Sequence, residues 1–279
     1  MKKNLLKLFS IAALILLIAN ANAQQDSIAK KDTTEKKQRF NILVGAFFPT
    51  VATKLKINGT SGRVGTDVGL EETFGLTQNP SVFRVDGLYQ MTRRSSFKAT
   101  YFQMNRKKTW VIDHDITVAD TTFNIGADID FHFNTQYFAL SYRYGLIARK
   151  DFQAGLSFGV RWLSFETGAK VVSDSINKEF NTQFGVPVVL FGINVSGNIL
   201  PRLVGRYDFE LFKLSFEGIQ GLVYENRFSL EYYFTKNIGV GGAFNAVLYS
   251  VKEFPLSDNF NGEVKFTMNG LSLFAAVKF

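Results

Sequence analysis

One short segment has side chains whose types could do chemistry. His114 stands between two carboxylates in Asp113-His114-Asp115, and a carboxylate beside an imidazole can orient it as a general base. A general base of this kind could catalyse hydrolysis or acyl transfer. Neighbouring residues of a strand point to opposite sides, however, and the only other histidine, His132, completes no further constellation. We therefore interpret 113–115 as part of a solvated external loop and expect no catalytic residue.

Metal and cofactor sites have little support in the composition. The chain has no cysteine and two histidines, so thiolate-based zinc and iron–sulfur sites are excluded, and other metal sites would need carboxylates. Gly239, Gly241 and Gly242 stand outside any phosphate-loop pattern, and we expect them to relieve crowding in a strand. We expect no cofactor and no metal.

The N-terminus has the layout of an export signal. Lys2 and Lys3 precede an apolar run over 5–18, which ends at the small-residue site Ala21-Asn22-Ala23. The run is shorter than the ~20 residues that span a bilayer as a helix. We expect a cleaved signal peptide over 1–23 and, over 24–39, a polar, flexible periplasmic leader.

The net charge does not favour nucleic-acid binding. The formal charge of +8 falls to +5 when Lys2, Lys3 and Lys7 leave with the signal peptide, and the leader accounts for part of the remainder. What is left over 40–279 is too weak a field for phosphate recognition. We expect no nucleic-acid partner.

Aromatic residues are abundant although the mean hydropathy is close to zero. The chain holds 29 Phe, 10 Tyr and 2 Trp at a mean hydropathy of +0.01. Between 222 and 235, Tyr224, Phe228 and Tyr232 share one parity while Arg227 and Glu231 share the other. Only a strand sorts these residues onto two faces, and aromatics toward lipid with charges toward a lumen is the pattern of a membrane barrel. The same split recurs over 81–91, 135–146 and 202–211, whereas after Glu210 the parity drifts, which we assign to a bulge or to residues beyond the membrane.

Short and long connections alternate along 40–279. Short polar links near 92–95, 148–151, 198–202 and 235–237 alternate with longer loops at 58–80, 113–127, 173–181 and 255–261, plus a tighter one near 218–221. This order is typical of outer-membrane barrels, whose periplasmic turns are short and external loops long. We predict an all-β fold, a transmembrane antiparallel up-and-down β-barrel over 40–279 with about ten strands, eight or twelve being the alternatives. The expected strands are 40–57, 80–92, 95–112, 128–147, 151–172, 182–198, 202–217, 222–235, 238–253 and 262–279.

Charged residues on the inward parity should form a network that fills a polar lumen. In so narrow a barrel they would pair across the interior, whereas an open pore needs a wider ring of strands. We expect Arg227 to offset Glu210, Glu225 or Glu231. The predicted network comprises Arg84, Asp86, Lys98, Arg143, Arg161, Arg206, Asp208, Glu210, Glu225, Arg227 and Glu231.

The last strand carries a further signature. Counting back in twos from the terminal aromatic gives the apolar series Phe279, Val277, Ala275, Leu273 and Leu271. This resembles the C-terminal signature of bacterial outer-membrane barrel proteins, which implies recognition by the barrel-assembly machinery. More broadly, 40–279, with features such as 83–89 and the basic turn after it, resembles the small OmpA-like and OmpW-like outer-membrane barrels. That resemblance implies architecture and a Gram-negative outer-membrane location, not an activity.

These observations lead to one expected function and two alternatives. We expect an integral outer-membrane protein, non-enzymatic and with a plugged or narrow lumen, that has a structural, adhesive or small-solute role. Its expected partners are outer-membrane lipid and, during biogenesis, the assembly machinery; the sequence identifies no ligand. The alternatives are a channel for small or hydrophobic molecules and a barrel-embedded hydrolase or acyltransferase.

Overall fold

The computed structural model describes residues 39–59, 67–73, 75–111, 116–118, 121–123, 128–172, 177–216, 219–257 and 260–279. The expected signal peptide over 1–23, nearly all of the expected leader and the segment Asp113-His114-Asp115 lie outside these residues. In the part of the chain that is described, no helix has the length and apolarity needed to cross a bilayer.

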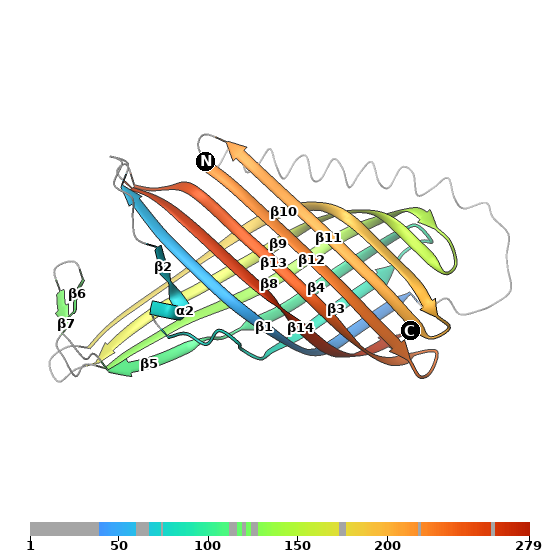
Figure 1. Ribbon diagram of the computed structural model, residues 1–279, viewed down its shortest axis with the longest axis horizontal. Helices are drawn as coiled ribbons and strands as arrows, with labels where there is room; N and C mark the ends of the chain where they lie inside the picture. Colours follow the sequence, from blue (N-terminus) through green and yellow to red (C-terminus); the bar gives the residue numbers. More distant parts are fainter. Residues whose placement is uncertain are drawn as a thin grey trace. The chain divides into compact units, whose positions relative to one another are not determined.

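Ten antiparallel strands in sequence order form a closed barrel wall (Figure 1). The ring closes through the pairing of its last strand with its first, from Asn41 opposite Lys278 to Gly59 opposite Phe260. Closure pairs the backbone groups that a sheet edge would leave free, which a strand in lipid requires. The predicted barrel of ten strands is thereby confirmed. Its strands are β1 (Phe40–Gly59), β3 (Val82–Gln90), β4 (Ser95–Met104) continued by β5 (Lys107–Val111), β8 (Asp128–Ala148), β9 (Phe152–Val172), β10 (Asn177–Leu200), β11 (Leu203–Phe216), β12 (Ile219–Tyr233), β13 (Ile238–Ser257) and β14 (Phe260–Lys278).

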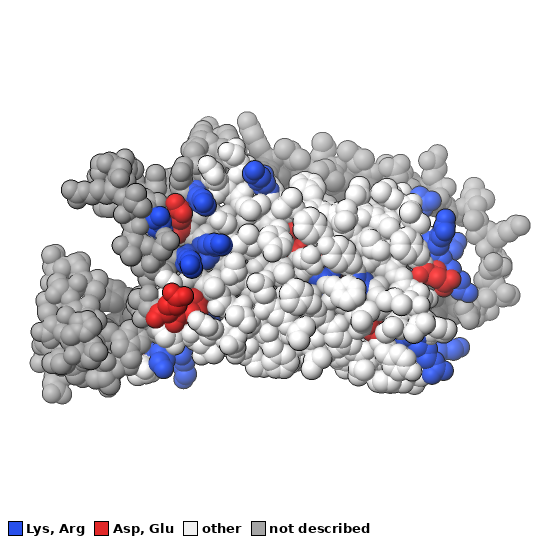
Figure 2. Space-filling model, viewed as in Figure 1, with Lys and Arg blue, Asp and Glu red and all other residues white. Residues whose placement is uncertain are grey.

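The two faces of the wall separate as the alternation predicted. On β12, Phe228 and Tyr232 are 46% and 47% exposed, while Arg227 and Glu231 are buried in the interior. On the face drawn in Figure 2, charged side chains gather toward the two ends of the barrel, and the broad band between them holds few charged atoms. An apolar outer band flanked by polar ends is the surface that a bilayer requires.

Several expected boundaries need correction. β10 begins at Asn177, so the connection expected over 173–181 is shorter, and the expected strand 95–112 is interrupted at Asn105 and Arg106. The bulge suggested after Glu210 is absent, because the β11–β12 register runs without a shift to Phe216. The pattern changes there for another reason: the interior becomes apolar at this height and the exterior becomes polar.

The connection between β1 and β3 closes a gap in the wall. β3 pairs with β1 only as far as Phe47. Beyond that point β1 pairs with the short strand β2 (Asp67–Gly69), and the Val51 amide donates to the Gln78 carbonyl at 2.8 Å. The single-turn helix α2 (Leu70–Thr73) follows β2, with Leu70 buried. The connection expected over 113–127 contains β6 (Ile116–Val118) and β7 (Thr121–Phe123), which pair with each other.

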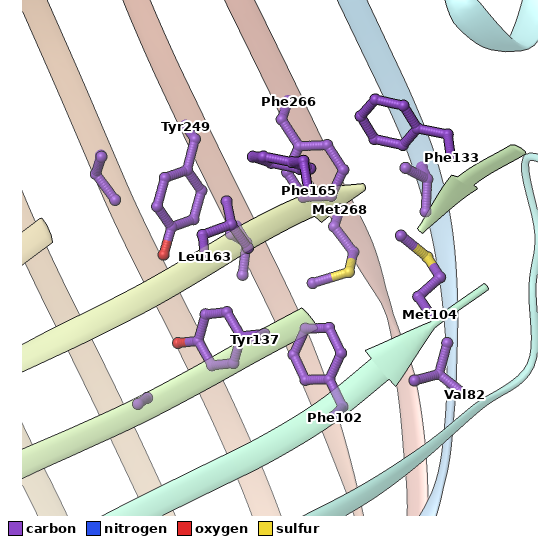
Figure 3. Packing of buried hydrophobic residues seen from close by; sticks show 14 of the residues in the cluster. Val82, Phe102, Met104, Phe133, Tyr137, Leu163, Phe165, Tyr249, Phe266 and Met268 are labelled. Atoms are coloured by element: carbon purple, nitrogen blue, oxygen red, sulfur yellow. The ribbon is translucent and has the colours of Figure 1, made fainter. Parts of the chain in front are cut away.

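The lumen is not polar throughout, contrary to the sequence-based expectation. Its loop-end half is filled by buried apolar side chains that share the inward parity with the charged ones. In Figure 3 the Phe102 and Tyr137 rings lie face to face, with centroids 4.7 Å apart, and Phe165 meets Phe266 edge to face at 5.6 Å. Interlocking aromatic pairs of this kind form a packed core. The interior therefore holds an apolar layer near the loops and a charged layer nearer the barrel's first and last residues. A smaller apolar cluster that includes Leu43, Phe274 and Ala276 lies beside the charged layer.

Candidate functional site in the barrel interior

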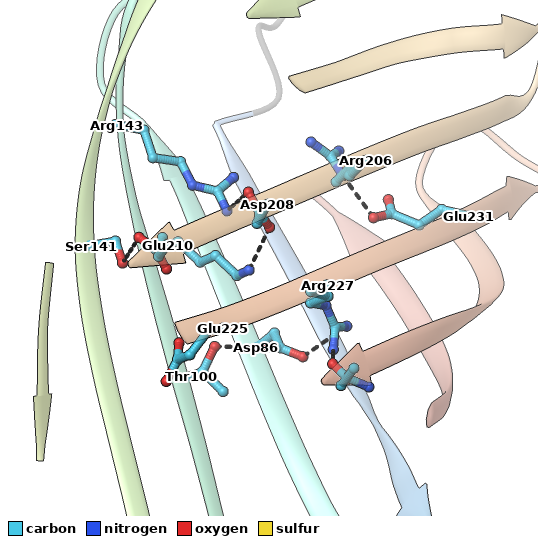
Figure 4. A network of polar contacts seen from close by, with 12 residues as sticks. Asp86, Thr100, Ser141, Arg143, Arg206, Asp208, Glu210, Glu225, Arg227 and Glu231 are labelled. Atoms are coloured by element: carbon cyan, nitrogen blue, oxygen red, sulfur yellow. Dashed lines mark hydrogen bonds and ion pairs between the residues drawn. The ribbon is translucent and has the colours of Figure 1, made fainter. Parts of the chain in front are cut away.

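The predicted charged residues all point inward and are joined by ion pairs. Several of these pairs link strands that are not neighbours in the wall. Asp208 on β11 accepts from Lys98 on β4 at 2.7 Å and from Arg143 on β8 at 2.5 Å (Figure 4). Bonds of this kind cross the interior and hold opposite walls together. The network therefore cross-links strands of the barrel wall as well as filling the interior.

Arg161 on β9 is the most highly connected cation of the network. Its guanidinium binds the carboxylate of Glu210 on β11 and, through Nε at 2.9 Å, that of Glu225 on β12. It also donates to the Ser141 hydroxyl on β8 at 2.9 Å. Four strands thus meet at one side chain whose residue is 2% exposed.

Two tyrosines from the apolar layer complete the hydrogen bonding of Glu225. The Tyr137 and Tyr249 hydroxyls donate to Glu225 Oε1 at 2.7 and 2.8 Å. Their rings pack among the apolar side chains while their hydroxyls reach the charges. These two residues join the two layers.

Arg227 does not pair as the sequence suggested. Its ion-pair partner is Asp86 on β3 at 3.2 Å, and it donates to the Asn245 side chain at 2.6 Å. Glu225 and Glu210 are held by Arg161, and Glu231 by Arg206 at 2.8 Å. The correction has a geometric cause: strand tilt and curvature bring Arg227 across the lumen to β3, which local sequence cannot reveal.

Asp86 is the shared acceptor of this second group. It accepts from Arg84 through Nε at 3.0 Å and Nη2 at 2.9 Å, and from the Thr100 hydroxyl at 2.6 Å. With Arg227 added, two cations and one hydroxyl surround a single buried carboxylate. Such a fully bonded arrangement is suited to holding a structure together.

Sequence reasoning missed a buried ion pair at the loop end. Arg106 Nη1 donates to Glu71 Oε1 at 2.5 Å, and the same carboxylate accepts from the Thr53 amide at 2.7 Å. Arg106 lies in the break between β4 and β5, and Glu71 lies on α2. The pair fastens the β1–β3 connection over the apolar layer. An acidic residue in a connection of mixed composition carries no signal that it will be buried.

Two small cavities lie among the described residues of the charged layer. One cavity of about 40 Å³ adjoins Arg161, Glu210 and Glu225, and a second of about 20 Å³ lies beside Arg206 and Glu231. These volumes suit one or a few water molecules rather than an organic substrate. Within the described residues, no group of three or more histidine or acidic side chains could hold a metal ion.

The residues of the predicted assembly signal lie on the outer face of the closing strand. Leu271, Leu273 and Val277 are 61%, 63% and 41% exposed, and Ala275 is also exposed. The Phe279 ring stacks on Phe40 with centroids 5.3 Å apart. The Phe279 carbonyl also accepts from the Phe40 amide at 2.9 Å, so the terminal residue closes the barrel seam.

A closed antiparallel barrel with an apolar outer band and a filled interior defines the class of this chain: it is a β-barrel of the outer-membrane type. No family model and no curated protein matches the sequence. Among solved structures, the chain is similar to the outer membrane protease OmpT of Escherichia coli. That similarity has a TM-score of 0.49 at 13% identity and covers 88% of this chain and 100% of OmpT.

Two further similarities are weaker. Ail, the attachment invasion locus protein of Yersinia pestis, has a TM-score of 0.31 at 10% identity, covering 86% of this chain and 99% of Ail. OprG of Pseudomonas aeruginosa has a TM-score of 0.32 at 10% identity, covering 87% of this chain and 97% of OprG. At such identities no activity transfers to this chain.

Proposed function

We propose that the chain is an integral outer-membrane protein with a non-conducting lumen and no catalytic role. Its interior would act as a structural core that fixes the barrel, and its function would reside on its outer surfaces, in a structural or adhesive role. The single observation that carries this proposal is the filled interior, in which ion pairs bridge opposite strands beneath a packed apolar layer.

The proposal includes a location and two kinds of partner. The apolar outer band would be surrounded by outer-membrane lipid, with the termini in the periplasm and the long connections outside. Leu271, Leu273, Ala275, Val277 and Phe279 would present the closing strand to the barrel-assembly machinery before insertion. The expected export signal over 1–23 is consistent with this route.

Conductance of the purified barrel in a planar bilayer tests the plugged lumen. We expect no stable ion current at concentrations at which a general porin, added to the same membrane as a control, gives clear steps. A steady current that changes when Arg227 is replaced by Ala would contradict the proposal. It would mean that ions pass the charged layer, and a channel would then be the better description.

A channel for hydrophobic molecules is the second candidate function. It is favoured by the apolar loop-end half of the lumen and by the wall gap that residues 67–81 close beside it. Entry of a hydrophobic fluorescent dye into vesicles would distinguish the two functions. If the barrel is plugged, the dye should enter vesicles that contain the protein as slowly as it enters vesicles without protein. If the barrel is a channel, the dye should enter the protein-containing vesicles faster.

A further inference from the structure

Lysines gather on the outer face of the barrel at its loop end, across neighbouring strands. The register aligns them in one row: Lys213 on β11 is opposite Leu222 on β12, Leu222 is opposite Ser250 on β13, Ser250 is opposite Lys265 on β14, and Lys265 is opposite Lys54 on β1. Lys252 follows two residues beyond Ser250, on the same face. Lys54, Lys213, Lys252 and Lys265 are exposed, and we call these four the lysine patch.

Within the patch, two cations oppose each other directly. Lys54 and Lys265 are register partners, and directly opposed side chains of an antiparallel pair lie on the same face. Like charges in this position destabilise a sheet. Among the described residues, neither has an ion-pair partner in the structure. An anion between the two ammonium groups would turn this repulsion into attraction.

Beside the lysine patch, one pair of neighbouring residues carries opposite charges. Lys56 and Glu263 are the next outward register partners, and both make interactions of their own. Both line the same depression as three lysines of the patch, so one carboxylate lies within this site and the lysines outnumber it. The net charge of this part of the surface is therefore positive.

The surface between these lysines is hollowed and has an apolar floor. A depression of about 290 Å³ is lined by Lys54, Lys252 and Lys265 together with Leu222 and Leu248. Cations around apolar side chains suit a molecule with a phosphate group above and hydrocarbon below.

The patch lies at the height where lipid headgroups are expected. On β13 the outward apolar residues run from Ile238 to Leu248, which at ~3.3 Å per residue and a tilt of ~40° is about 25 Å along the barrel axis. That matches the hydrocarbon thickness that such barrels cover. Lys252 follows about 10 Å higher by the same geometry, beyond the hydrocarbon and within the headgroup layer.

The opposite side of the barrel differs at this end. There the exposed outward side chains include carboxylates, Asp130 on β8 and Glu166 on β9, beside the lysines Lys107 and Lys170. Mixed charge of this kind gives little net attraction for an anion. The charge asymmetry points to a partner that binds one side of the barrel only.

We propose that the lysine patch binds the phosphate groups of a phosphorylated lipid in the outer leaflet, with its acyl chains along the apolar band. The inference rests on the outer-membrane location and the external position of the loops proposed above. Ammonium groups attract phosphate as point charges, and each lysine near an anionic lipid surface strengthens binding independently. Such a lipid would hold β11, β12, β13, β14 and β1 together from outside, where the lumen network holds the wall from within.

Native mass spectrometry of the folded barrel in nonionic detergent tests this. The probe is a bisphosphorylated glucosamine-disaccharide lipid, compared with its dephosphorylated form bearing the same acyl chains. The variant Lys54→Gln/Lys252→Gln/Lys265→Gln should retain the phosphorylated lipid roughly 100-fold less well than the unmodified barrel. The control Lys107→Gln/Lys170→Gln removes two outward-facing charges at the same end of the barrel and should retain the lipid normally.

Three outcomes would overturn the proposal: equal retention by both variants, equal retention of the dephosphorylated lipid, or displacement of the lipid by millimolar inorganic phosphate, which would indicate a site for free phosphate. Unheated gel mobility verifies that each variant is folded. If the triple variant does not fold, Lys265→Gln alone, which removes one lysine of the opposed pair, replaces it. The outcome is independent of the lumen, since a barrel that conducts ions could still retain lipid at the patch.

Discussion

Replacing Arg161 by Ala should weaken the barrel more than any other single change in the lumen network. Arg161 neutralises two carboxylates, those of Glu210 and Glu225, and donates to Ser141. The truncated side chain would leave both acids buried without their cation. Glu225 keeps the hydroxyls of Tyr137 and Tyr249, so part of its hydrogen bonding survives.

The expected magnitude follows from these contacts. Breaking one buried ion pair by removing one partner costs about 3–5 kcal/mol of folding free energy. Two acids lose their partner here, yet the adjoining cavity of about 40 Å³ and the space left by the arginine allow water to reach them. We therefore expect the free energy of unfolding to fall by about 3 kcal/mol, the lower end of the range for one pair.

Urea titration of the barrel in lipid vesicles measures this change, with the folded fraction taken from unheated gel mobility. Arg161→Ala should lower the urea midpoint, and Arg161→Met/Glu210→Gln/Glu225→Gln should recover most of the loss because no unpaired charge remains. Arg149→Ala, at an exposed turn, is the control for arginine loss in general. An unchanged midpoint for Arg161→Ala, or a triple variant no more stable than the single one, would refute the reasoning.

Four other predictions concern closure, assembly, packing and chemistry. The folded protein should migrate faster on a gel when unheated, because a closed barrel keeps its backbone paired in detergent; equal migration would argue against closure. Phe279 stacks on Phe40 at the seam, so its deletion should cause periplasmic accumulation or proteolysis of the protein while synthesis is unchanged. Phe279→Tyr should insert normally, and cell fractionation measures where each variant is found. Gly241→Val should lower the urea midpoint, because an added Cβ would come within 2.5 Å of the Phe274 ring, whereas Gly242→Ala, where a Cβ meets nothing closer than 3.6 Å, should be tolerated. His114→Ala should leave any lipid or peptide turnover of the purified protein unchanged, and loss of a measured turnover would favour the hydrolase or acyltransferase alternative.

The alternation of residues was sufficient to predict the strands and their outward faces. Phe228 and Tyr232 differ from Arg227 and Glu231 in polarity, and a strand must put them on opposite sides. The alternation of short and long connections then indicated the strand order and a number of about ten. Both signals are local, since they depend only on neighbours in the chain.

The same reasoning failed near the loop end of the barrel. There the inward side chains are apolar and the outward side chains are polar, the reverse of the expected pattern. On β11 the inward Phe212 packs against the apolar cluster and the outward Lys213 is exposed, so the pattern inverts beyond Glu210 although the register continues. An apolar side chain that faces lipid and one that packs in a core look alike in a sequence. A lumen with an apolar half was therefore not foreseen.

The sequence by itself determined that the chain forms about ten strands, which residues face inward in the charged half of the barrel and which strand ends the barrel, because these follow from periodicity and turn chemistry. Only the tertiary structure decided that Arg227 pairs with Asp86, that Glu71 is buried against Arg106, and that Lys54 faces Lys265. Each of these pairs joins segments far apart in the chain. Their distance is set by the tilt, curvature and closure of the whole barrel, which no local stretch of sequence contains.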